Sequence, residues 1–199
     1  MLAWHGPKDS PLLVVLAPGD SGRLEDTGPT LVAEGLARAG IRVGRCAFPP
    51  CDSRQGQVRD VVLADRIRAI SAAREPSQAL IVGGFSRGAR VGASLVDELG
   101  AVGLLGFAYP FHPRQDPNPG GRVAQLAALS VPALIVQGTR DALGNREQVA
   151  GYRLPAHIAL HWLEDANHAL QPRPRSGFTA VQQLTRASQV AAAFIRRLQ

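Results

Sequence analysis

Hydrophobic residues alternate between two patterns along this chain. Short continuous apolar runs predict buried β-strands at 12–17, 41–48, 79–83, 102–109, 133–137 and 158–163. Between these runs, apolar residues recur at three- and four-residue spacing, which predicts helices at 30–39, 57–73, 87–99 and 123–129, just after Asn145, and at 179–198. The last of these helices carries one apolar face that can lie on a sheet.

Regular alternation of strand and helix predicts parallel strands, because each strand is followed by a helical crossover. Right-handed crossovers place helices on both faces, which gives an α/β fold with three layers (α/β/α) and a mostly parallel sheet of about six strands. Every loop that follows a strand then lies at one edge of the sheet, where open α/β sheets bind their ligands.

Length and composition predict one domain that spans residues 1–199, since 45% of the residues are hydrophobic and no linker interrupts the pattern. The formal charge of +6 comes almost wholly from arginine, with Lys8 the only lysine. These arginines are scattered and only 5% of residues are aromatic, so we expect no nucleic-acid partner.

No apolar run has the length needed to cross a bilayer, and the first ten residues do not resemble a secretion signal. We therefore expect a cytoplasmic protein with no membrane partner. Cys46 and Cys51 are expected to stay reduced as core and loop thiols. Neither belongs to a Cys/His set with metal-ligand spacing, so we predict no metal and no cofactor.

A candidate catalytic motif lies at residues 84–88, which read Gly-Phe-Ser-Arg-Gly and join a predicted strand to a predicted helix. A serine in a sharp strand-to-helix turn exposes its hydroxyl, and glycine two places on either side lets the two backbones approach. This G-x-S-x-G pattern is short, so its position between strand and helix supplies the specificity. It predicts that Ser86 is a nucleophile.

A serine hydroxyl needs an imidazole to take its proton and a carboxylate to hold that imidazole. Asp141 follows the strand at 133–137, and His168 follows the strand at 158–163. Parallel strand ends can deliver Ser86, Asp141 and His168 to one point. These three residues are the predicted catalytic set.

Other residues compete for these roles. His112 follows the strand at 102–109, so it is assigned to the pocket and is the main rival base. Asp165 and Asp116 are rivals to Asp141. The other histidines lie within or beside strands or near the N-terminus, where packing or a surface position is the simpler interpretation.

A tetrahedral intermediate also needs two backbone N–H donors. Arg87 follows the nucleophile and begins a helix, so its N–H is one predicted donor. The turn after the first predicted strand supplies the second, which we assign to Asp20. A carboxylate at Asp20 that pointed inward would oppose the oxyanion.

With these residues in place, the chain resembles the α/β-hydrolase superfamily over nearly its whole length. More narrowly, it resembles the small dienelactone-hydrolase-like branch that includes the hydrolase-like domain of testis-expressed and NSL-complex-subunit proteins. Three runs carry this likeness: 108–113 (AYPFHP), 134–141 (LIVQGTRD) and 160–164 (LHWLE). The resemblance implies a minimal α/β-hydrolase fold without a cap domain, with Ser86, Asp141 and His168 as triad.

The function predicted from this set is a serine hydrolase that cleaves a small-molecule ester, thioester or similar acyl substrate. Phe85, Tyr109, Phe111 and His112 are the candidate substrate-binding residues, and Arg87 or Arg140 could favour an acidic substrate.

Two other interpretations stay open. One is a GDSL-type hydrolase in which Ser21 attacks and Asp165 orients His168. The other is a non-catalytic interaction module, since a fold does not fix a function.

Overall fold

The computed structural model describes residues 2–47, 56–114, 116, 118 and 120–199. Within these residues one sheet contains seven strands: β1 (Leu2–His5), β2 (Leu12–Ala17), β3 (Arg42–Cys46), β4 (Ala79–Phe85), β5 (Gly103–Phe107), β6 (Ala133–Gly138) and β7 (Ile158–Leu163). The six strands that the sequence predicts are all present, and two of them, β2 and β7, have the predicted ends.

The strands are ordered β1-β3-β2-β4-β5-β6-β7, and β2 to β7 pair in parallel with their neighbours. β1 pairs antiparallel with β3 at the sheet edge, with Leu2 opposite Cys46. The sequence-based prediction missed β1, because this short edge strand alternates exposed and half-buried residues and carries no continuous apolar run.

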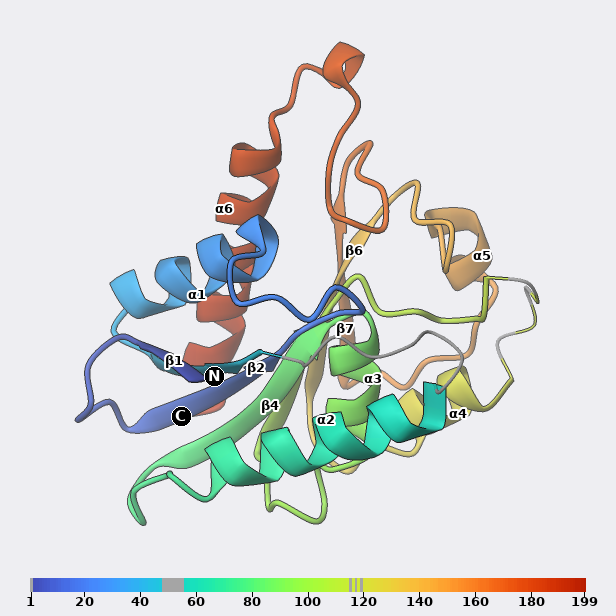
Figure 1. The fold of residues 1–199 in the computed structure, drawn as a ribbon. Helices are drawn as coiled ribbons and strands as arrows, with labels where there is room; N and C mark the ends of the chain where they lie inside the picture. The colour runs from blue at the N-terminus through green and yellow to red at the C-terminus, as the bar shows by residue number, and fades with distance from the viewer. Residues whose placement is uncertain (1, 48–55, 115, 117, 119) are drawn as a thin grey trace.

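Six α-helices cover the two faces of the sheet in the described residues: α1 (Thr27–Arg38), α2 (Gly56–Ser71), α3 (Arg87–Ala93), α4 (Gly120–Ala127), α5 (Arg146–Ala150) and α6 (Ala180–Arg196). α1 and α6 pack side by side on one face, while α2 and α3 lie on the other (Figure 1). Buried residues of α4 and α5 belong to the same apolar cluster as α2 and α3.

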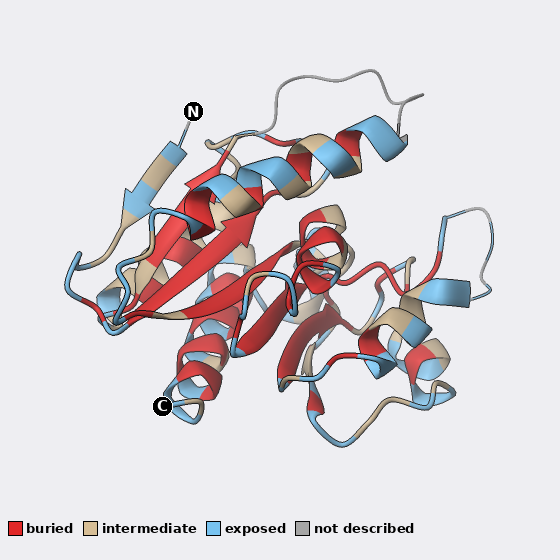
Figure 2. Cartoon of the chain, turned by 90° about the horizontal axis from the view of Figure 1, so that it is seen from below, coloured by how far each residue is buried: buried red, intermediate tan, exposed pale blue. Residues whose placement is uncertain are grey.

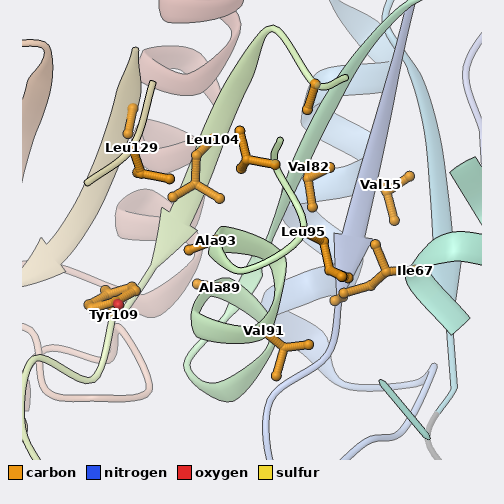
Figure 3. Packing of buried hydrophobic residues seen from close by; sticks show 14 of the residues in the cluster. Val15, Ile67, Val82, Ala89, Val91, Ala93, Leu95, Leu104, Tyr109 and Leu129 are labelled. Atoms are coloured by element: carbon orange, nitrogen blue, oxygen red, sulfur yellow. The ribbon is translucent and has the colours of Figure 1, made fainter. Parts of the chain in front are cut away.

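Central strands are buried on both faces, and the helices bury only the side that meets the sheet (Figure 2). Alternate residues of β2 point to opposite faces, so Val15 joins the α2–α3 side and Val14 the α1–α6 side. On the first side, Ile67 of α2 lies near Val15, and Val91 of α3 belongs to the same cluster (Figure 3). The predicted three-layer α/β/α fold is confirmed.

α3 is shorter than the helix predicted at 87–99. After Ala93 the backbone makes tighter bonds three residues back, from Ser94 N to Val91 O (3.1 Å) and from Leu95 N to Gly92 O (3.0 Å). The Ser94 hydroxyl also donates to Val91 O, at 2.7 Å. This side-chain bond competes with the α-helical pattern, so residues 94–99 form turns instead.

The strand order reverses between β2 and β4, because β2 leads outward to β3 whereas β4 begins the run to β7. Crossovers from these two strands leave on opposite faces, which opens a crevice at their carboxyl ends. Within the described residues, no inserted element forms a cap over that edge. None of the described helices is long and apolar enough to cross a membrane.

Cys46 is buried at the end of β3, and burial raises the pKa of its thiol to about 11. Cys51 lies outside the described residues. The reduced state of the two cysteines therefore stays a prediction.

Candidate active site

Ser86 lies in the turn between β4 and α3, with φ 49° and ψ −113°. An L-residue rarely adopts a positive φ, so the surrounding structure must hold it there. A Cβ on Gly84 would lie 2.6 Å from Ala17 O, and one on Gly88 would lie 2.5 Å from Pro18 O. The two glycines thus let the turn press against the end of β2, as the sequence pattern predicts.

Ser86 and His168 are joined by a hydrogen bond, with Ser86 Oγ 2.8 Å from His168 Nε2. The other ring nitrogen, Nδ1, lies 2.8 Å from Asp141 Oδ2 and 2.9 Å from Oδ1. An Nδ1–H that donates to the carboxylate leaves Nε2 free to accept the serine proton. The structure therefore brings the three predicted side chains into one hydrogen-bonded series.

Asp141 is fully buried at the carboxyl end of β6. Its Oδ1 accepts from Leu143 N at 2.8 Å, and its Oδ2 accepts from Gln137 Nε2 at 2.9 Å. Gln137 is also fully buried, and its Nε2 lies 3.1 Å from both Tyr109 O and Gly144 O. These donors hold the carboxylate in one orientation, so it can face the imidazole.

Asp165 does not contact His168 but closes the loop that carries it. Its carboxylate accepts from Arg173 N at 2.9 Å and pairs with the Arg173 guanidinium, while Arg140 Nη1 donates to Asp165 O at 3.0 Å. The hydrogen bond from Arg173 lowers the pKa of Asp165 to about 2. Asp165 is therefore a loop residue and no rival to Asp141.

Three of the proposed substrate-binding residues lie elsewhere. Tyr109 and Phe111 have no exposed surface, and Tyr109 packs in the cluster beside α3 with its hydroxyl 3.1 Å from Gln125 Oε1 (Figure 3). His112 is buried too, and its Nδ1 donates to Pro113 O at 2.8 Å. Their positions at strand ends suggested a pocket wall, but all three are buried and none of them lines the hollow beside Ser86.

Phe85, the fourth of these residues, is half-buried beside Ser86 and stacks on Phe107 with ring centroids 4.8 Å apart. Ser21, the nucleophile of the GDSL interpretation, donates instead to the Asp26 carboxylate. Since neither Ser21 nor Asp165 contacts His168, the geometry does not favour that interpretation. Asp116, another rival acid, is exposed and accepts a hydrogen bond from Asn118 N.

The predicted oxyanion residues, Asp20 and Arg87, both line a hollow of about 240 Å³ with Ser86 and His168. Asp20 is held by two guanidinium groups: Arg59 Nη2 donates to its carbonyl, and Arg87 Nε donates to its carboxylate, each at 2.5 Å. The Asp20 charge is thus paired with Arg87, which offsets its repulsion of an oxyanion.

Arg90, which the sequence analysis missed, also lines this hollow and shares an ion-pair partner with Arg87. Asp60 of α2 accepts from Arg87 Nη1 at 2.7 Å and from Arg90 Nη2 at 2.6 Å. Partial burial raises the pKa of Asp60, but the hydrogen bonds from Arg90 and Arg87 outweigh burial and hold it below its usual range. The three-residue spacing of the two arginines on one helix was the available signal.

A second hollow, of about 390 Å³, is also lined by Ser86 and His168. Its walls include Phe85, Pro29 and Ala169, and it contains no arginine among the described residues. Ser86 therefore borders both an arginine-lined hollow and a more apolar one.

No set of three or more His, Cys, Asp or Glu side chains in the described part of the chain is arranged to hold a metal ion. The hydrogen-bonded series instead suits nucleophilic catalysis, in which a serine attacks and an imidazole transfers the proton.

Residues 11–196 match the model of a family described as an alpha/beta hydrolase domain. The fold is similar to an α/β serine hydrolase homologue from Coxiella burnetii, at 18% identity over 97% of this chain and 90% of that one, with a TM-score of 0.71.

Two further solved structures share the fold. One is a serine hydrolase without a lid from Xanthomonas campestris, at 22% identity, covering 97% of this chain and 88% of that one, with a TM-score of 0.68. The other is the esterase domain of a Rhodothermus marinus protein, at 17% identity, covering 98% and 91%, with a TM-score of 0.69. The absence of a cap in the described residues agrees with the lidless neighbour.

The close approach at the Ser86 turn leads to a first prediction. Gly88→Ala should lower the free energy of unfolding by about 1–3 kcal/mol, because its Cβ meets backbone atoms that cannot move aside easily. Gly121→Ala in α4 is the matched control, since nothing lies within 4 Å of its added Cβ. Urea denaturation measures both, and equal stability of the two variants would contradict the packing argument.

A second prediction concerns pH. Because the folded pKa of Asp165 lies below its reference value of 3.8, its pairing stabilises the protein above about pH 4 and this stability is lost as pH falls towards 2. Asp165→Asn, which tolerates the positive φ of 56°, should therefore lower the melting temperature at pH 7 and have little effect near pH 2.

The control for this pH series is Asp9→Asn, which removes an exposed carboxylate with no ion pair in the described residues. A difference between wild type and Asp165→Asn that stayed constant from pH 7 to about pH 2 would contradict the linkage.

Proposed function

The chain belongs to the alpha/beta hydrolase domain family, and from this premise we propose that it is a serine hydrolase acting on an ester, thioester or similar acyl substrate. The observation that carries the proposal is the series from Ser86 Oγ through the His168 ring to the Asp141 carboxylate, in which both contacts are 2.8 Å long. A purely structural serine would not need a buried carboxylate and an imidazole aligned behind it.

In the first half of the reaction, Ser86 Oγ attacks the carbonyl carbon as His168 Nε2 takes its proton. Asp141 stays ionised and stabilises the imidazolium that forms. Collapse of the tetrahedral intermediate breaks the bond to the leaving group, which takes the proton from His168 Nε2. The acyl group then remains on Ser86 as an ester.

The second half repeats these steps with water as the nucleophile. His168 takes a proton from water, the hydroxide adds to the acyl carbon, and the acid product leaves as Ser86 regains its proton. In both halves the N–H groups of Arg87 and Asp20 are the proposed donors to the oxyanion. Arg87 supplies the first amide of α3, and the first amides of a helix have no partner within it.

Placement in the dienelactone-hydrolase-like branch belongs to this proposal and rests on the runs at 108–113, 134–141 and 160–164. The burial of Tyr109, Phe111 and His112 gives the first run a packing role. A carboxylesterase-like activity in the cytoplasm, without metal or cofactor, completes the proposal.

Covalent labelling tests the nucleophile. A fluorophosphonate probe should label wild type at one site and should not label Ser86→Ala, because the probe reacts with an activated serine. Ser21→Ala is the control and should be labelled like wild type, since Ser21 bonds Asp26 and not His168. Intact-mass spectrometry reads the adduct.

Two results of the labelling experiment would contradict the proposal. Labelling that survived in Ser86→Ala and vanished in Ser21→Ala would favour the GDSL interpretation. No labelling of folded wild type would favour a non-catalytic interaction module.

Turnover tests the other two residues. Asp141→Asn and His168→Ala should each lower kcat/KM for a nitrophenyl ester by about 10³- to 10⁴-fold, because the serine proton then lacks a correctly oriented acceptor. Circular dichroism and thermal melting establish that the variants are folded. His157→Ala, on the loop before β7, is the matched control and should keep the wild-type rate. A wild-type rate in either triad variant would remove that residue from the mechanism.

A further inference from the structure

We infer that the arginine-lined hollow beside Ser86 binds a carboxylate, so that the substrate is an acyl compound carrying a carboxylate a few atoms from the scissile carbonyl. This inference rests on the proposed function for the scissile bond, whereas the carboxylate site itself rests on the arginines. Arg87, Arg90, Arg114 and Arg122 line the hollow together with Ser86 and His168.

Charge in this hollow is unbalanced among the described residues. Asp60 pairs with Arg87 and Arg90, and Asp20 also pairs with Arg87. Neither Arg114 nor Arg122 forms an ion pair with any described residue. Arg114 and Arg122 therefore add positive charge beside the nucleophile that no carboxylate of the described residues pairs with.

Arg122 of α4 is the centre of the proposed site. It is half-buried, and its Nη1 donates to Pro110 O at 3.1 Å, while its other side-chain N–H groups have no partner in the described residues. Burial and then the nearby Arg90 charge lower the pKa of Arg122 from its ordinary value. A guanidinium crowded by like charge, with unused donors, gains most from a bound anion.

The N–H groups of a guanidinium are spaced to bind both oxygens of a carboxylate, and this cluster already binds the carboxylate of Asp60. Asp60 receives hydrogen bonds from Arg87 and Arg90 at 2.6–2.7 Å, in the range of strong charge-assisted bonds. Arg122 lies in the same group of charges, since the Arg90, Arg87 and Asp60 charges all act on it. A substrate carboxylate would complete the pairing that Asp60 begins.

The charges around the hollow restrict where a substrate carboxylate can bind. A neighbouring hollow shares Arg90, Pro113 and Arg122 with the first and continues past the start of α4, where Asp116 lines it. The Asp116 charge disfavours a second carboxylate there. The favoured position therefore lies between Ser86 and Arg122, and the neutral part of the substrate fits the hollow on the Phe85 side.

Binding to the Ser86→Ala protein tests the site without turnover. The probes are monomethyl glutarate, with its anion on the acyl side, 4-acetoxybutanoate, with its anion on the alcohol side, and the neutral isostere methyl 5-methylhexanoate. At least one anionic ester should bind about tenfold or more tightly than the neutral one by calorimetry. The ester that binds tightly shows which side carries the carboxylate.

Arg122→Gln in the same background should weaken binding of that anionic ester by about 10- to 100-fold. Arg196→Gln is the matched control, because Arg196 is an exposed arginine in the last turn of α6 and does not line the hollow. It should bind like the parent protein.

Arg114→Gln is the second variant. Arg114 is exposed, so its replacement should leave the fold intact even if the loss of Arg122 disturbs the Pro110 loop. It should weaken anion binding about two- to fivefold. Raising salt from about 0.05 to about 0.5 M should weaken only the anionic ester.

Equal binding of the anionic and neutral esters, or anion binding that neither arginine variant changes, would overturn the inference. Wild-type turnover of the same esters separates the two proposals. Tight anion binding without any turnover would count against the proposed function and leave the carboxylate site standing. Turnover of all three esters at equal kcat/KM would retain the hydrolase and remove the carboxylate site.

Discussion

The turn after β4 depends on one steric constraint, which is that three stretches of backbone meet where β2 ends and α3 begins. The space beside Ala17 O and Pro18 O has no room for a side chain at position 84 or 88. Because both positions are glycine, β4 and α3 close on β2 and hold Ser86 at a positive φ. The contact also brings the Asp20 loop beside the first turn of α3, so the nucleophile and both proposed oxyanion residues share one rigid frame.

Buried or paired carboxylates lie on two sides of the Ser86 turn and have different partners. On one side, Asp141 is fully buried, and its carboxylate contacts neutral amide donors and the His168 ring. Among these partners, only the imidazole can become a cation that the carboxylate charge stabilises. On the other side, Asp20 and Asp60 pair with guanidinium groups of α3. The arginines keep these acidic charges neutralised near a position where an oxyanion is proposed to form.

Sequence patterns anticipated the elements and the hydrogen-bonded series, because strand periodicity and residues just past strand ends are local features. They missed β1, which has no apolar run of its own, and they placed Tyr109 and His112 in a pocket although the chain buries both. Arg90 and Arg122 were also missed, since an arginine in a helix is usually solvated. Only the packing of α2, α3 and α4 brings them together, and no spacing along the chain encodes that meeting.

The choice of cation at this edge of the sheet has a chemical consequence. A primary amine close to an activated acyl group can attack it, whereas a protonated guanidinium is a poor nucleophile. The hollow beside Ser86 contains arginines and no lysine among its described walls. Lys8, the only lysine in the sequence, precedes β2 and faces Glu75, at the other end of the sheet. Cationic side chains can therefore surround the serine with little risk that the protein acylates itself.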